Sequence, residues 1–253
     1  MREDVRGAVR TALLALVPAA ILVALGSLTW ANRRFYLVSL LMLVLALVPM
    51  LLRFERRAPQ ARELVPLAVL VALGAAGRAA FAFAPAFKPV AAIVIIAGAA
   101  FGCEAGFVVG AMTAFVSNFF FGQGPWTPWQ MLGFGLVGFF AGLLFARRAR
   151  PSLLSLCVYG ALSVALLYGP LLDVGSVFMV TGDVTRAAIL TALGTGVTFN
   201  LAHAFATVVF LALAGMPLLK KINKVKIKYG VGETDDRGGA EHAMDRSVCR
   251  DEE

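Results

Sequence analysis

The residues best suited to binding a ligand lie at positions 118 to 130, which read Asn-Phe-Phe-Phe-Gly-Gln-Gly-Pro-Trp-Thr-Pro-Trp-Gln between two apolar segments. Prolines and glycines fix an irregular backbone, Trp rings offer large apolar faces with one N–H donor each, and side-chain amides can orient a polar ligand. The alternative is that Trp126 and Trp129 belong to an aromatic belt at the level of the lipid headgroups. The candidate ligand-binding side chains of this stretch are Asn118, Gln123, Trp126, Thr127, Trp129 and Gln130.

Ionisable residues are rare within the apolar segments, so each of them is a functional candidate. Arg78 could hold an anionic ligand group or extend its side chain to the membrane interface. His203 and Asn200 lie in the last apolar segment, where a single histidine more often satisfies hydrogen bonds in the core than binds a ligand. Asp173 precedes that segment in a predicted outer loop, where it could close over a ligand or face water. Glu104 is predicted to be a solvated carboxylate in the tight turn Phe-Gly-Cys-Glu-Ala-Gly.

Sequence motifs for catalysis are absent. The chain has no H-E-x-x-H, G-x-S-x-G or G-x-x-x-x-G-K-[ST] motif, and its cysteines Cys103, Cys157 and Cys249 lack the spacing of a metal site. We therefore expect a protein that is not an enzyme and that holds no metal or other cofactor. Two alternatives are a membrane-embedded enzyme that uses Arg78, Asn200 and His203, and a purely structural membrane subunit.

The composition is that of a membrane protein. Hydrophobic residues make up 60% of the 253 positions and charged residues only 15%, and the mean hydropathy is +0.82. These values lie far from those of a soluble globular domain. Most of the positive charge behind the net charge of +8 lies in short clusters between apolar runs. This distribution indicates the orientation of the chain in the membrane rather than binding of nucleic acid.

Apolar runs predict an all-α integral membrane protein with eight spans, since about 20 residues cross a bilayer core. The segment that begins at Lys88 is short and could be re-entrant. The predicted spans are residues 11–30, 35–53, 64–83, 88–102, 105–121, 131–146, 151–169 and 186–215.

Basic clusters predict the orientation of these spans. With eight spans, all of the clusters fall on one side, which the positive-inside rule makes cytoplasmic together with both termini in the plasma membrane. The Trp-rich loop, the turn at 84–88 and the segment 168–185 then lie outside. The clusters are Arg2, Arg6 and Arg10; Arg53, Arg56, Arg57 and Arg62; Arg147, Arg148 and Arg150; and Lys220, Lys221, Lys224, Lys226 and Lys228.

Three parts of the chain differ in composition. Residues 1–57 are predicted to form a two-helix membrane hairpin, residues 58–219 a six-helix unit, and residues 220–253 a cytoplasmic tail that is first basic and then acidic. The tail has too few apolar residues to build a core, so we expect it to be disordered.

Small residues line one face of the third predicted span. Ala68, Ala72, Ala76 and Ala80 recur every four residues, and such faces let helix backbones approach closely in lipid. Half or more of these stripes pack only within their own chain, and the glycine pairs Gly106/Gly110 and Gly138/Gly142 are expected to do so.

Three stretches together resemble a known family. Residues 77–98 (GRAAFAFAPAFKPVAAIVIIAG), 105–111 (AGFVVGA) and 117–131 (SNFFFGQGPWTPWQM) are similar to the substrate-binding S-component of energy-coupling factor (ECF) vitamin transporters. The resemblance covers the six-helix unit, and the run at 117–131 is its most specific part. Among the subfamilies, the chain looks closest to the cobalamin type, although an aromatic outer pocket with few charges would suit a flavin as well.

The resemblance implies a fold and a site. A family member has six helices and binds its vitamin from outside, in a cavity capped by three loops that correspond here to residues 82–89, 121–130 and 169–185. The first of these loops adds Phe83, Phe87 and Lys88 to the ligand-binding candidates, and the set as a whole includes Arg78, Asp173, Asn200 and His203.

The resemblance also implies partners. Family members dock through small residues of their first helix onto a transmembrane coupling subunit that is carried by two ATPases. The docking motif A-x-x-x-A matches Ala68 to Ala72, and Ala76 continues the same face. The N-terminal hairpin departs from the six-helix pattern, which leaves open whether this face is free to dock.

Overall fold

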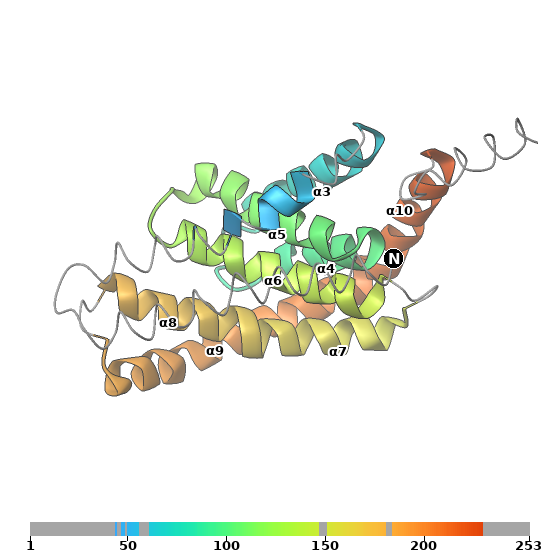
Figure 1. Cartoon of the computed structure of the whole chain (residues 1–253). Coiled ribbons are helices and arrows are strands. Elements are labelled where there is room, and N and C mark those ends of the chain that lie inside the picture. Colours follow the sequence, from blue (N-terminus) through green and yellow to red (C-terminus); the bar gives the residue numbers. More distant parts are fainter. Residues whose placement is uncertain are drawn as a thin grey trace, which may run out of the picture.

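The computed structural model describes residues 44, 47–48, 50–55, 61–146, 151–180 and 184–229, and every element among them is a helix. The all-α fold is therefore confirmed for this part of the chain (Figure 1). From residue 61 onward the elements are α3 (Ala61–Ala80), α4 (Val90–Phe101), α5 (Cys103–Phe121), α6 (Thr127–Phe145), α7 (Leu153–Ser163), η1 (Val164–Tyr168), α8 (Gly169–Val180), α9 (Arg186–Phe210), η2 (Leu211–Gly215) and α10 (Met216–Tyr229).

Five helical segments of the described chain are long and apolar enough to cross a membrane, so the protein is a multi-pass membrane protein. The first two predicted spans lie largely outside the described residues, as do both termini. The predicted span at 88–102 is the helix α4, which has only 12 residues. At ~1.5 Å per residue it extends ~18 Å, which is less than the ~30 Å of a hydrocarbon core.

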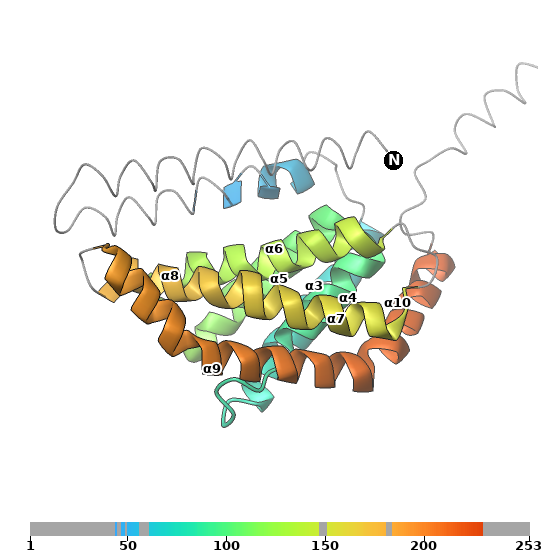
Figure 2. The same cartoon turned by 90° about the horizontal axis from the view of Figure 1, so that it is seen from below.

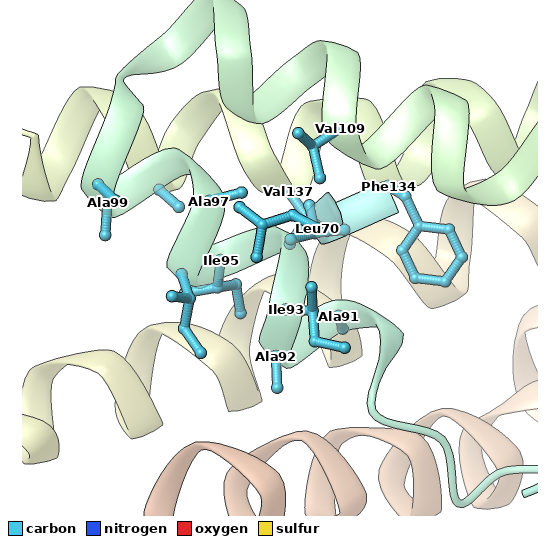
Figure 3. Close-up of a cluster of buried hydrophobic side chains, with 14 of the residues drawn as sticks. Leu70, Ala91, Ala92, Ile93, Ile95, Ala97, Ala99, Val109, Phe134 and Val137 are labelled. Carbon is cyan, nitrogen blue, oxygen red and sulfur yellow. The ribbon is translucent and has the colours of Figure 1, made fainter. Parts of the chain in front are cut away.

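Helix α4 forms the centre of the bundle. All of its residues are buried, as expected for a helix that is apolar on every side. Figure 3 shows Ile93 and Ile95 of α4 among side chains of the surrounding helices, including Leu70 of α3 and Phe134 of α6. This packing brings the ends of α3, α5 and α6 close together around one short helix.

Glycines hold α5 against α6 at backbone contact. A Cβ atom on Gly106 would lie 2.4 Å from the carbonyl oxygen of Gly138, and one on Gly110 would lie 2.3 Å from that of Phe134. A side chain at either position would therefore force the helices apart. The expectation that these glycines pack within the chain is confirmed.

Two continuous helical segments, α7–η1–α8 and α9–η2–α10, extend beyond the predicted boundaries. The segment 169–185 was predicted as a loop, but α8 occupies Gly169–Val180, and the predicted disordered tail from residue 220 is helical as far as Tyr229. Each continuous segment contains a π-helical segment that ends two residues before a proline: η1 before Pro170 and η2 before Pro217. Proline interrupts the α-helical bonding pattern, and the wider π turn takes up this interruption so that the helix continues. Figure 2 shows α7 and α8 end to end, with α9 alongside and α10 turning away.

Glu104 is not the solvated turn carboxylate that the sequence predicts. The tight turn exists, with Gly102 at φ 97°, but Glu104 is 8% exposed in the first turn of α5. It accepts a hydrogen bond at Oε1 from Nε of Arg53, with the two atoms 2.6 Å apart. The cause is a partner 51 residues earlier in the chain, which the local sequence does not reveal.

The described part of the N-terminal hairpin packs on α5 and α6. Leu47 and Met50 are buried in one apolar cluster with Phe107 of α5 and Phe139 of α6. The predicted docking residues Ala68, Ala72 and Ala76 of α3 are all exposed. The described hairpin residues therefore leave the small-residue face of α3 uncovered.

Candidate ligand-binding site

Arg78 points into the helix bundle. It lies in the last turn of α3, and its Nη1 donates to Oγ of Ser117 at 2.6 Å and to Oδ1 of Asn118 at 2.7 Å. Both partners are completely buried at the end of α5. An arginine that extended its side chain to the membrane interface would point the other way. The geometry therefore favours an inward role for Arg78.

Asn118 joins Arg78 to the Trp-rich loop. Its Nδ2 donates to Oγ1 of Thr127 at 3.0 Å and to Oε1 of Gln130 at 2.9 Å, so both of its N–H groups are used. Thr127 in turn donates to Oε1 of Gln123 at 2.9 Å. These amides and hydroxyls hold the end of α5 to the start of α6, and they shape the loop before any ligand arrives.

The two tryptophans of the loop occupy different environments. Trp126 is 41% exposed, whereas Trp129 is 5% exposed. The Trp129 ring stacks on Phe178 of α8 at a centroid distance of 5.8 Å, and a Cβ on Gly175 would lie 2.7 Å from it. The predicted ligand-binding role of Trp129 has no support from this position. We assign its ring to packing between α6 and α8.

Trp129→Ala should lower the thermal unfolding temperature in detergent much more than Trp126→Ala, because truncating a buried aromatic side chain costs about 3–5 kcal/mol. Conversely, Trp126→Ala should leave the fold intact and weaken vitamin binding by about 2 kcal/mol, the loss typical of an aromatic anchor. Thermal unfolding and ligand titration of the two purified variants measure both effects. Equal unfolding temperatures would contradict the packing role of Trp129.

A second polar pair joins α8 to α9. Nδ2 of Asn200 donates to Oδ2 of Asp173 at 2.7 Å. Asn200 lies in the last predicted span, now α9, whereas Asp173 lies in α8 rather than in the predicted outer loop. Glycines on the opposite helices make room for this pair. A Cβ on Gly196 would lie 2.2 Å from Oδ2 of Asp173, and one on Gly169 would lie 2.3 Å from Cγ of Asn200.

His203 follows Asn200 by three residues on the buried side of α9. Only 6% of it is exposed, and its ring meets Tyr168 of η1 edge-on at 5.2 Å, with Phe134 and Phe199 at 6.3 and 6.5 Å. Its Nε2 has no hydrogen-bond partner in the described chain. Buried polar atoms normally have a partner, and leaving one without costs free energy. His203 is thus not the satisfied core histidine that its type favours.

The turn between α3 and α4 contributes a second cation. Nζ of Lys88 lies 5.2 Å from the centre of the Phe121 ring, and Cζ of Arg78 lies 4.7 Å from the same ring. Phe87 packs against Phe210 of α9 at 5.1 Å. Phe83 is 83% exposed and forms no part of this group.

The predicted residues therefore fall into two sets. One set comes from the adjoining ends of α3, α5 and α6, from the turn before α4, and from α8 and α9: Arg78, Phe87, Lys88, Asn118, Thr127, Gln130, Asp173, Asn200 and His203. Phe83, Gln123 and Trp126 are exposed, and Trp129 belongs to a helix interface. The sequence analysis missed Ser117, Phe121 and Tyr168. Ser117 and Phe121 are four residues apart at the end of α5, and this spacing could have indicated a shared helix face.

This arrangement suits a ligand with a flat or ring-shaped apolar body and several polar groups. Aromatic rings surround His203, and the polar side chains come from five helical elements. No group of three or more potential metal ligands occurs in the part of the chain that the structure describes.

Comparison with known protein families gives one matching family model. Residues 60–224, well over half of the chain, match the family model described as ECF-type riboflavin transporter, S component. No curated protein and no solved structure matches the chain.

Proposed function

Because the chain belongs to the family of ECF-type riboflavin transporter S components, a family of transporter subunits rather than of enzymes, we propose that its ligand is a flavin vitamin, bound from outside the cell. The observation that carries the proposal is the aromatic group of Phe134, Tyr168 and His203, where Phe134 and Tyr168 stack at 4.2 Å. Such an array can accept a flat ring system, and neighbouring amides can pair with its polar edge.

The geometry supports binding between the α3–α5–α6 ends and the α8–α9 pair. Arg78 and Asn118 come from α3 and α5 and Lys88 from the turn before α4, whereas Tyr168 comes from η1 and Asn200 and His203 from α9. The Nε2 of His203, which has no partner in the described residues, is a donor or acceptor available to a ligand.

Cobalamin is the second candidate. Among the subfamilies, the chain looks closest to the cobalamin type, and a corrinoid is also a bulky ring with peripheral amides. The matched family model carries the name of riboflavin, which is why a flavin stands first.

The partners follow from the family. S components work with an ECF module, and we propose that Ala68, Ala72 and Ala76 of α3 form the face that contacts its transmembrane coupling subunit. We also propose that both termini are cytoplasmic, as the basic clusters favour. The vitamin-binding loops then open to the outside.

An absorption spectrum of the purified protein tests the ligand directly. We expect a flavin spectrum with a maximum in the blue region to co-purify with the protein, or to appear after incubation with riboflavin and removal of the free vitamin. A corrinoid spectrum would select the second candidate. No retained chromophore after incubation with either vitamin would contradict the proposed function. A double variant, Asn200→Ala with His203→Ala, should lose the signal while Ser152→Ala, at the exposed N-cap of α7, should keep it.

A further inference from the structure

We propose that this site contains an anion-binding subsite, formed by Arg78 and Lys88, which holds an anionic group of the phosphate-ester class when the ligand carries one. The inference rests on the proposed function, because it concerns the same site. It adds a subsite that the family name does not imply, since riboflavin itself has no formal charge.

The first observation is that no acidic side chain in the described part of the chain neutralises the two cations. The described residues include only four acidic side chains, Glu55, Glu63, Glu104 and Asp173. Neither Arg78 nor Lys88 forms an ion pair with any of them. Uncompensated charges inside a membrane protein are expensive and mark sites where a counter-charge binds.

The second observation is the hydrogen bonding of Arg78. A guanidinium has five N–H donors, and both hydrogen bonds of Arg78 within the described chain leave from Nη1. The edge formed by Nε and Nη2 therefore has no acceptor there. This edge is the one that binds carboxylates and phosphates through two parallel hydrogen bonds.

The third observation is the shared position of the cations. Arg78 and Lys88 approach the same Phe121 ring, and the charge of Arg78 acts on Lys88. Two like charges that act on each other repel, and an anion within reach of both would be attracted by each of them. Ser117 and Asn118, both fully buried, hold the guanidinium in place. The side chain of Arg78 therefore loses little conformational entropy when a ligand binds.

An interfacial role explains these observations less well. A lysine and an arginine at the end of a span commonly reach toward lipid headgroups. Here Arg78 is instead bound to buried partners, and both cations are half-buried over an aromatic ring.

Matched ligands that differ by a phosphate test the inference. Riboflavin is compared with flavin mononucleotide, and cobinamide with cobalamin, which carries a phosphodiester that cobinamide lacks. For whichever pair binds, we expect the phosphate-bearing member to bind the purified protein at least tenfold more tightly. Isothermal titration or flavin fluorescence provides the dissociation constants.

Two variants assign that preference to the cations. Lys88→Gln removes a cation that makes no hydrogen bond in the described chain, so it should fold normally, and Arg78→Gln removes the other. Each should reduce the preference for the phosphate-bearing member to less than threefold. Lys220→Gln, which removes an exposed cation of α10, is the matched control and should keep the full preference.

The outcomes separate this inference from the proposed function. If a vitamin binds but its phosphate gives no preference, or if both variants retain the preference, the anionic site is wrong and vitamin binding stands. If none of the four compounds binds, the proposed function fails and the anionic site fails with it.

Discussion

Ala72→Trp should abolish vitamin uptake by cells that carry the complete transporter, while the isolated variant binds its vitamin as tightly as the original protein. Ala72 is exposed on α3, and so are Ala68 and Ala76. Small residues at a helix interface in lipid permit close backbone approach, and an indole ring prevents it. A loss of about 3 kcal/mol in docking energy would reduce assembly with the coupling subunit more than 100-fold.

The structure separates this face from the inside of the protein. The buried side of α3 consists of Leu67, Leu70, Gly74 and Ala75, and a Cβ on Gly74 would lie 2.6 Å from Cγ2 of Thr113. The glycines of α3 thus serve internal packing, whereas the alanine stripe faces away from the bundle. A ring at position 72 therefore lies outside the site that binds the vitamin.

Uptake of labelled vitamin by cells and ligand titration of the purified subunit measure the two effects. Ala214→Trp is the matched control, because Ala214 is an exposed alanine of η2 on another helix, and both uptake and binding should survive. Parallel loss of binding and uptake in Ala72→Trp would show that the stripe supports the fold rather than a partner.

Most of the helices can be predicted from the sequence. A membrane span must satisfy its backbone hydrogen bonds internally and must be apolar along its length, so it appears as a long apolar run. The segment 88–102 is predicted as a short span that could be re-entrant, whereas α4 is a helix of 12 residues that is buried throughout. The predicted spans 151–169 and 186–215 ended too early, because α8 and α10 continue past Pro170 and Pro217. The π segments before them allow both helices to continue, and such local adjustments are common around proline in membrane helices.

The site was only partly predictable for a different reason. Arg78, Asn200 and His203 stand out because polar side chains are costly in a membrane. Their partners do not, since Arg78 meets Asn118 across 40 positions and Asn200 meets Asp173 across 27. Trp129 resembled a ligand anchor by type and place, but the packing of α8 against α6 decides its environment, and nothing near it in the sequence encodes that contact.

Reconstituted alone in liposomes, this chain should bind its vitamin and fail to accumulate it, whether ATP or an ion gradient is supplied. The sequence contains no G-x-x-x-x-G-K-[ST] loop for a nucleotide. Within the membrane helices of the described chain, Asp173 stands apart from the other carboxylates, because Glu63 and Glu104 lie in the first turns of α3 and α5. A single carboxylate that already accepts a hydrogen bond from Asn200 does not form a relay for protons.

Addition of the coupling subunit and its two ATPases should then give ATP-dependent uptake, since the family works as part of an ECF module. Ala72→Trp in the same liposomes should remove this uptake, which ties the energy supply to the α3 face. Flux of labelled vitamin into the vesicles, with non-hydrolysable nucleotide as the control, measures the effect. Accumulation by the isolated chain under a proton or sodium gradient would overturn the assignment, and Arg78, Asp173 and His203 would then mark a transport path of their own.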